Sequence, residues 1–519
     1  MRGMKKRSHN RVVFKPYLQG QLQMPTDLDE LVPAGHLVRV VSGAIERMDL
    51  KPLLRPYAGG GTSSYHPKMM LKVLVYAYTQ QIYTSRRIAK ALRENVHFMW
   101  LSGNSHPDFR TINRFRGEVM RGIIQEVFGA VLELLLEAGY VKLEHYFLDG
   151  TKIEANANRY QWVWAKSTRK HREKLQEKVK GLLDEIEREN DAENEAYGDE
   201  DLEEMGGSGP IDAEKLEKKI QELNERLSGG TGKGKLARAV RKLERDYLPR
   251  QRKYEEQEKK LAGRNSYAKT DEGATFMRMK EDHLKNGQLK PGYNVQLGTE
   301  NRFVVGFSVH QRPGDTGCLI PHLEQFQHQV GRLPRNVIAD AGYGSEENYA
   351  YLEGNGVGNY VKYSSFDRER KKCRADRFLA SAFTYDPERD EFHCPAGQRL
   401  VYRHTSVRTT EAGYRRQLRN YEATGCEGCR WRSECTRASI HRWLQVSLSL
   451  EEMKSRAREN LCSERGQQLR SRRLTEVESV FGRLKHNWGF RRFKLRGVDK
   501  VKVEWGLLCM AHNLATIAT

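Results

Sequence analysis

Apolar residues recur at helical spacing through the first part of the chain. They do so over 37–45, 69–83 and 88–92, with polar residues between them. Apolar positions that return every three or four residues predict helices with one buried side. Thr84 precedes one of these segments and can cap it, because its hydroxyl accepts from the first free backbone amides. Residues 1–140 are therefore predicted to form an N-terminal helical domain.

The next helix of this region is basic and begins after Asp108, a second candidate cap. Its polar side chains are of types that contact DNA bases, namely Arg110, Asn113, Arg114 and Arg116. With the helix over 84–94 it suggests a helix-turn-helix-like unit, although the connection over 95–107 is longer than that motif's usual turn. We favour DNA binding by this region, and the alternative is an interaction or dimerisation module.

Apolar runs typical of strands follow at 144–149, 292–311 and 336–340, and the chain is helical again from Leu469 to Thr519. Strands mixed with helices indicate an α/β core. This core is assigned to three separate stretches, 141–164, 264–365 and 466–519.

Two long insertions separate these stretches. Residues 165–263 are rich in Glu and Lys, with glycine-rich breaks, which predicts a charged, coiled-coil-like helical hairpin. Such a hairpin is either a solvated insertion or a partner-binding coiled coil. Its seam would be formed by Leu182, Ile186, Leu216, Ile220, Leu223 and Leu227. Residues 366–465 form the second insertion, which contains most of the cysteines.

Three acidic residues stand out against this frame. Asp149 and Asp340 each end an apolar run, Gly150 lets the chain leave the first strand freely, and Glu478 lies in a helical stretch. Two strand-end aspartates and a helix-borne glutamate can converge on a pair of Mg²⁺ or Mn²⁺ ions, which prefer oxygen ligands. Two such ions serve phosphoryl transfer. Taken singly, each aspartate is better explained as a turn residue, as is Asp315.

The helix around Glu478 supports its selection. One apolar stripe of this helix should bury against a sheet, and it consists of Val477, Phe481, Leu484 and Trp488. Glu478 and Lys485, seven residues apart, share a different face. Glu476 lies roughly 180° around the helix from Lys485. Glu478 is therefore preferred to Glu476 as the third acid.

The charge of the chain points to an acidic partner. Its 519 residues include 89 Lys and Arg against 68 Asp and Glu, which gives a net charge of +21. A nucleic acid backbone fits this excess, since each neutralised phosphate releases counterions; charge for solubility is the alternative. No apolar run approaches the roughly 20 residues of a membrane span, and the basic start lacks the apolar core of a secretory signal. A cytoplasmic protein with reduced cysteines is expected.

Four of the eight cysteines are spaced as ligands of a structural zinc ion. Cys426, Cys429 and Cys435 follow a Cys-x2-Cys-x5-Cys pattern, and Cys394 precedes them. Thiolates of this kind hold tetrahedral Zn²⁺. The longer step and the distant fourth cysteine are looser than a standard finger, so unmetallated cysteines that pack a small domain are the alternative.

The residues around the three acids resemble the catalytic core of the DDE transposases of bacterial insertion sequences. The resemblance rests on Asp-Gly-Thr-Lys-Ile-Glu from Asp149, Ala-Asp-Ala-Gly-Tyr from Ala339, and Glu478 with Lys485 seven residues on. Tyr-Asn-Val-Gln from Tyr293 adds to it, and the N-terminal and C-terminal stretches are also similar. It implies an RNase H-like fold, a mixed sheet flanked by helices, in which Asp149, Asp340 and Glu478 hold two metal ions.

One departure concerns the residues just before the glutamate. Related transposases often place Tyr and Arg seven and four residues before it, whereas this chain has Ser471 and Leu474 there. Arg472 or Arg473 is the candidate replacement for the arginine. The resemblance further implies phosphate contact by Lys485. The basic run after the helix, which includes Arg491 and Arg492, is favoured as a further DNA contact because of its position.

The expected activity is Mg²⁺-dependent cleavage at the ends of an insertion sequence, followed by attack of the freed 3′-OH on target DNA. The expected partners are double-stranded DNA and, because two ends must be joined, at least a second copy of the chain. Two alternatives remain: an RNase H-like nuclease without strand transfer, and a transposase-derived DNA-binding protein that no longer catalyses.

Overall fold

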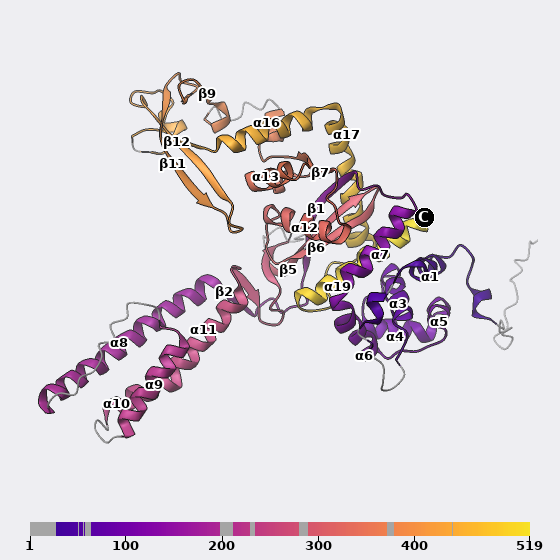
Figure 1. Ribbon diagram of the computed structural model, residues 1–519, viewed down its shortest axis with the longest axis horizontal. Helices are drawn as coiled ribbons and strands as arrows, with labels where there is room; N and C mark the ends of the chain where they lie inside the picture. Colours follow the sequence, from indigo (N-terminus) through magenta and orange to yellow (C-terminus); the bar gives the residue numbers. More distant parts are fainter. Residues whose placement is uncertain are drawn as a thin grey trace, which may run out of the picture.

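The computed structural model describes residues 27–49, 51–55, 57, 64–197, 211–228, 234–279, 289–370, 378–438 and 440–519. The basic N-terminus, most of the glycine-rich breaks and Cys373 lie outside these ranges. Figure 1 shows a central sheet with the N-terminal helices packed beside it, a long helical arm, and a small separate sheet. No helix in the described ranges combines the length and apolar character needed to cross a membrane.

The central sheet is mixed, as the resemblance implies. Antiparallel β5 pairs with β1 on one side and with β4 and β6 along the other, whereas β1, β7 and β8 run parallel. Its strands are β1 (His145–Glu154), β4 (Thr275–Arg278), β5 (Leu289–Glu300), β6 (Phe303–His310), β7 (Asn336–Ala339) and β8 (Gly358–Val361). The predicted strand pair over 292–311 is confirmed as β5 and β6.

Helices cover both faces of this sheet. On one face, Tyr146 of β1 packs against Phe326 of α12 (Leu319–Val330). On the other face lies a continuous helix made of α17 (Glu464–Arg473), η8 (Leu474–Glu478), α18 (Ser479–Gly482) and η9 (Arg483–Asn487). Both η8 and η9 are π-helical turns. The predicted apolar stripe of this helix is buried, from Val477 to Trp488. Beside the parallel strands, α13 (Glu346–Gly354) packs against β8.

The N-terminal region is helical and shares its core with the sheet. Its main helices are α1 (Leu37–Arg47), α3 (Pro67–Thr79), α4 (Ser85–Glu94), α5 (Val96–Ser102), α6 (Phe109–Arg114) and α7 (Ile124–Glu137). Thr84 and Asp108 cap α4 and α6 as predicted. A helix, α5, occupies the connection between them. One hydrophobic cluster runs from Val38 through the sheet to Ala515.

The C-terminal helix α19 (Val498–Ile517) joins these two parts. It is buried along most of its length, between β6 and the N-terminal helices α3 and α7. Glu504 on this helix is fully buried, and its Oε2 accepts from the backbone amides of Lys494 and Leu495 at 2.9 and 3.0 Å. The helix therefore anchors the N-terminal region directly to the loop that follows the Glu478 helix.

The helical insertion is more than a hairpin. It contains α8 (Ala165–Tyr197), α9 (Ala213–Ser228), α10 (Lys235–Lys242), π-helical η4 (Leu243–Tyr247) and α11 (Leu248–Leu261). The predicted seam residues pack in a separate hydrophobic cluster, which α10 and η4 complete with Val240 and Leu243. Figure 1 shows this arm projecting from the sheet at the ribbon of β2 (Trp162–Trp164) and β3 (Ser266–Ala268).

The cysteine-rich insertion forms a five-stranded antiparallel sheet in the order β13-β12-β11-β10-β9. Its strands are β9 (Thr384–Asp386), β10 (Glu391–His393), β11 (Arg399–Thr409), β12 (Arg415–Ala423) and β13 (Trp443–Val446). This sheet has its own small apolar cluster. The long helix α16 (Leu448–Cys462) leads back to α17 and the central sheet (Figure 1).

Candidate active site

Asp149 lies in the middle of β1, not at its end. The strand continues to Glu154, and Asp149 pairs with Leu297 of β5. Parallel pairing with β7, in contrast, covers only His145 to Phe147. The prediction of a strand-end position is therefore wrong for Asp149, because the antiparallel partner extends β1 past the point where the parallel partner stops.

Asp340 lies beside Asp149 because of the strand register. His145 pairs with Asn336, so β1 and β7 are offset by 191 positions (336 − 145), the same offset that separates Asp149 from Asp340 (340 − 149). Asp340 follows the last residue of β7, and its Oδ1 accepts from the amide of Gly342 at 2.8 Å. The carboxylate is thereby held at the start of the next turn, with its side chain 38% exposed.

Glu478 reaches the same place from the helix. It ends the π-helical turn η8, and Arg473 immediately precedes that turn. In a regular α-helix, residues five apart point about 140° away from each other at about 100° per residue. A π-turn closes i to i+5 bonds instead, and Arg473 Nη1 lies 3.3 Å from Glu478 Oε1. Arg473 thus shares the face of Glu478, as an arginine four residues before it would in an α-helix.

The guanidinium of Arg473 lies among all three acids. Its Nη2 is 3.2 Å from Asp149 Oδ2 and 3.7 Å from Asp340 Oδ2, while its Nη1 contacts Glu478. The side chains of Arg473 and Asp149 are only 14% and 11% exposed, whereas that of Glu478 is 47% exposed. The three carboxylates therefore converge on a single positive charge.

A buried polar network backs this cluster. Asp315, expected to be only a turn residue, accepts from the amides of Asn294 and Gln296 at 2.7 and 3.1 Å. The hydroxyl of Tyr343 donates to Gln296. Burial raises the pKa of Tyr343 well above its ordinary value, and the negative charges of Asp315, Asp149 and Asp340 raise it further. Four carboxylates thus surround this corner of the sheet.

Gly150 is required by the same network. A Cβ at this position would lie 2.3 Å from Gln296 Nε2 and 2.8 Å from Asp315 Oδ1. Its role is therefore to make room for these two side chains, and the expectation that it releases the chain from a strand end is wrong.

Glu476 and Lys485 are both buried and do not face solvent. Glu476 is buried, and its carboxylate accepts from the amide of Arg302 at 2.7 Å and from Arg472 at 2.8 Å. It therefore fixes the turn between β5 and β6, which supports the choice of Glu478. Lys485 is also buried, and its Nζ donates to Thr151 Oγ1 at 3.1 Å. Thr151 lies two residues after Asp149, on the same face of β1.

Two family models match the chain. One, described as a transposase DDE domain, covers residues 393–518, and the other, described as a transposase domain (DUF772), covers residues 26–118. No curated protein matches the chain. The chain belongs to the DDE-type transposases of insertion sequences. The first match includes Glu478 and Lys485 of the transposase, whereas Asp149 and Asp340 lie outside both matches. The geometry described above is what places those two aspartates beside Glu478.

The basic residues proposed to bind DNA fall into two groups. Arg110, Asn113 and Arg114 are exposed on α6, whereas Arg116 is 2% exposed and donates to the carbonyl of Tyr83 at 2.7 Å. The prediction of base contact is therefore wrong for Arg116. It is a structural residue that ties the turn after α6 to the start of α4.

The second group borders the acids. Arg472 binds Glu476 and, at 3.3 Å, the side-chain oxygen of Asn301. Arg492 donates to the carbonyls of Ala155 and Ala157 at 3.1 and 3.2 Å, so it holds the segment after β1. Arg491 is exposed. In the transposase, Arg472 and Arg492 have structural partners, which neither of their sequence contexts indicated.

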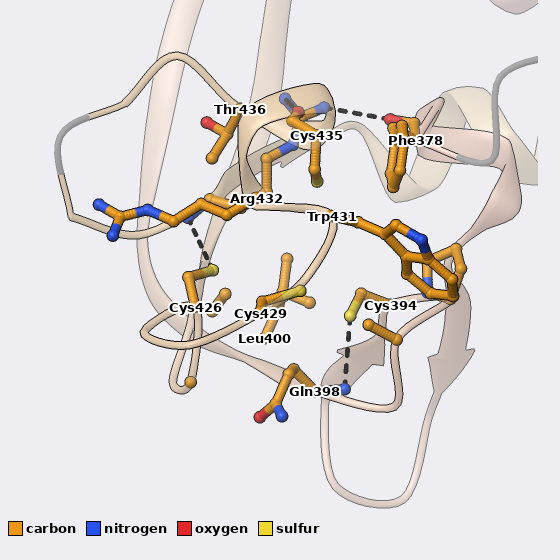
Figure 2. Close-up of a pocket in the computed structure, with 15 residues that line it drawn as sticks. Phe378, Cys394, Gln398, Leu400, Cys426, Cys429, Trp431, Arg432, Cys435 and Thr436 are labelled. Carbon is orange, nitrogen blue, oxygen red and sulfur yellow. Dashed lines mark hydrogen bonds between the residues drawn. The ribbon is translucent and has the colours of Figure 1, made fainter.

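The four cysteines line a small cavity of about 30 Å³ in the five-stranded sheet of the cysteine-rich insertion, called the outer sheet below. Figure 2 shows Cys394, Cys426, Cys429 and Cys435 around this cavity, with Trp431 at its edge. Burial raises the pKa of Cys435, Arg442 lowers it, and the other three thiols raise it further. Backbone amides donate to two of the sulfurs, at 3.3 Å for Cys394 and 3.4 Å for Cys426.

The four sulfur atoms line one cavity, but they are too far apart to bind one ion together. Among the described residues, no three of the sulfurs lie within 4.8 Å of one another. A zinc ion of the usual geometry would need them to move together. The sequence spacing therefore identified residues that do converge, while zinc binding itself stays a prediction.

Proposed function

We propose that this transposase binds the ends of its insertion sequence, cleaves DNA there, and joins the resulting 3′-OH ends to target DNA. The proposal is carried by one observation: Asp149, Asp340 and Glu478, from two strands and a helix, converge on one cationic group. DDE transposases use divalent metal ions, and carboxylate oxygens are suitable ligands for Mg²⁺ or Mn²⁺.

The donor set fits a pair of such ions, because the three carboxylates attract positive charge and leave positions open for water and phosphate. When bound there, two divalent ions would activate the attacking oxygen and stabilise the leaving one. The space between the acids is shared with Arg473, whose buried Nε has no hydrogen-bond partner. An unsatisfied buried donor costs about 1–3 kcal/mol. This cost favours movement of the Arg473 side chain out of the space between the acids.

The surrounding residues would bind and orient the DNA. Once displaced from the acids, Arg473 remains beside the site and can contact a phosphate group, which its planar guanidinium binds well. Lys485 is close to Asp149 through Thr151, so its charge acts on the same region. The exposed α6 residues and Arg491 would contact DNA outside the reacting bond. Two ends brought together imply a complex of at least two chains.

The test is a strand-transfer assay with element-end DNA, Mg²⁺ and a target plasmid. Asp149→Asn and Glu478→Gln should each lower both cleavage and joining by at least about 100-fold, since metal stabilisation of transition-state charge amounts to several kcal/mol. A matched control is Glu464→Gln, which removes an exposed carboxylate at the start of α17.

The outcomes separate three functions. Cleavage with joining, lost in both variants and kept in Glu464→Gln, supports the proposal. Cleavage without joining identifies a nuclease. Binding of element ends without either reaction identifies a DNA-binding protein that does not catalyse, and unchanged joining in the Asp149 and Glu478 variants removes the basis of the proposal.

A further inference from the structure

A second group of metal-ligating side chains lies on the outer sheet, far from the three acids in the fold (Figure 1). Asp386 of β9 and Glu391 of β10 are direct cross-strand partners, and His393 follows Glu391 by two positions on the same face of β10. One donor atom from each of these three side chains lies within 4.8 Å of the others. The strand pairing alone brings them together.

Glu391 is the residue that requires an explanation. Its side chain is only 5% exposed, and its Oε1 makes no hydrogen bond. His393 Nε2 lies 3.3 Å from this oxygen but is not aligned to donate, and Arg399 Nη1 approaches the other oxygen only to 3.7 Å. A buried carboxylate with an unsatisfied oxygen costs free energy unless a positive charge is supplied.

Asp386 places a second negative charge beside Glu391. Like charges directly opposite each other on antiparallel strands are destabilising. Asp386 Oδ1 accepts from the amides of Glu388 and Arg389 at 3.0 and 3.3 Å, and so it holds the turn and leaves Oδ2 for another partner. Two carboxylates and an imidazole therefore face one another, and the buried Oε1 of Glu391 between them has no hydrogen bond.

The group is separate from the thiols. Successive side chains of a strand point to opposite faces, and Phe392 and Cys394 belong to the apolar cluster of this sheet. His393 therefore points away from the cavity lined by the four cysteines.

We propose that Asp386, Glu391 and His393 form a site for one divalent transition-metal cation, of the class of Zn²⁺ or Mn²⁺. Imidazole and carboxylate together suit these ions better than Mg²⁺. Ligand atoms of one tetrahedral zinc ion lie about 2.0–2.2 Å from it and hence about 3.3–3.6 Å from one another, so side-chain movements of about 1 Å close the group. The ion would tie β9 to β10 next to the cysteine cavity.

The test measures the zinc content of the full-length protein after equilibration with Zn²⁺ and dialysis. Glu391→Gln and His393→Gln should each bind one zinc ion fewer per chain than the wild type. Glu388→Gln, which removes an exposed carboxylate from the same turn, should keep the wild-type content. Because the readout is metal content, it does not depend on whether the protein joins DNA, and Asp149→Asn should not change it.

A thermal measurement guards against misfolded variants. Zn²⁺ should raise the melting temperature of the wild type and of a Cys426→Ser variant, but not that of Glu391→Gln. Without metal, Glu391→Gln should be at least as stable as the wild type, because it removes the buried charge. Equal zinc content in wild type, Glu391→Gln and His393→Gln would overturn the proposal, as would loss of the ion only on substitution of the cysteines.

Discussion

The position of Arg473 leads to a quantitative prediction about metal affinity. In the structure its guanidinium contacts the three acids, and metal ions held by the same carboxylates must displace it. Replacing Arg473 by Gln removes the competing charge and keeps a side chain of similar length. The variant should bind Mn²⁺ more tightly than the wild type, although it should join DNA less well if Arg473 also contacts phosphate.

The magnitude follows from the contacts that are lost. The contact with Asp149 is an ion pair at 3.2 Å between two largely buried side chains, and a charged contact of this kind contributes about 1.5–3 kcal/mol. The contact with Glu478 is half exposed, and such pairs contribute about 1 kcal/mol or less. Displacing Arg473 thus costs about 1.5–4 kcal/mol. At about 1.4 kcal/mol per tenfold, Arg473→Gln should lower the Kd for Mn²⁺ by about 10-fold or more.

The assay is calorimetric titration of the DNA-free protein with Mn²⁺. Arg472→Gln is the matched control, because Arg472 precedes Arg473 on the same helix but binds Glu476 and Asn301 instead of the acids. Its Kd for Mn²⁺ should stay within about threefold of the wild type. An Arg473→Gln protein that binds Mn²⁺ as weakly as the wild type would refute the reasoning that Arg473 competes for the space between the carboxylates.

Three other predictions follow from the structure. Gly150→Ala should lower the free energy of unfolding by about 1–3 kcal/mol, as overpacking does, because its Cβ would clash with Gln296; urea unfolding measures this, and an unchanged midpoint would contradict it. Burial lowers the pKa of His322 to about 3 from 6.5, so stability that is complete above pH 6.5 should be lost as the pH falls toward 3, and the melting temperature should fall less steeply in His322→Gln than in the wild type. If the four thiols hold zinc, Cys435→Ser should release it and lower the melting temperature of the chain, whereas an unchanged zinc content would favour unmetallated packing.

The sequence predicted which acidic residues lie together better than it predicted their geometry. The types and contexts of Asp149, Asp340 and Glu478 were sufficient to propose them, and the helix face that Glu478 shares with Lys485 was sufficient to prefer it to Glu476. The extension of β1 beyond Asp149 was missed, because it depends on pairing with β5 nearly 150 residues away in the chain. The sequence around Asp149 does not indicate a pairing partner that far away in the chain.

The sequence named Arg472 and Arg473 as candidates for the arginine before the glutamate, but it could not choose between them. Periodicity arguments assume 3.6 residues per turn, and a π-turn that realigns residues five apart is set by how the helix packs on β1 and β5. For the same reason, Arg116 was assigned to DNA although it is buried. The sequence of a basic helix does not distinguish an arginine that faces solvent from one that faces the core.

The most direct test of the central claim is a metal-switch experiment at Glu478. Glu478→Cys replaces a hard oxygen ligand by a soft thiolate, which binds Mn²⁺ better than Mg²⁺. If Glu478 holds a catalytic metal ion, the variant should fail to join pre-cleaved element ends in Mg²⁺ and regain measurable joining in Mn²⁺, while Glu464→Cys joins normally in both. Joining by Glu478→Cys in Mg²⁺ at the wild-type rate would contradict the assignment of Glu478 and, with it, the proposed three-acid centre.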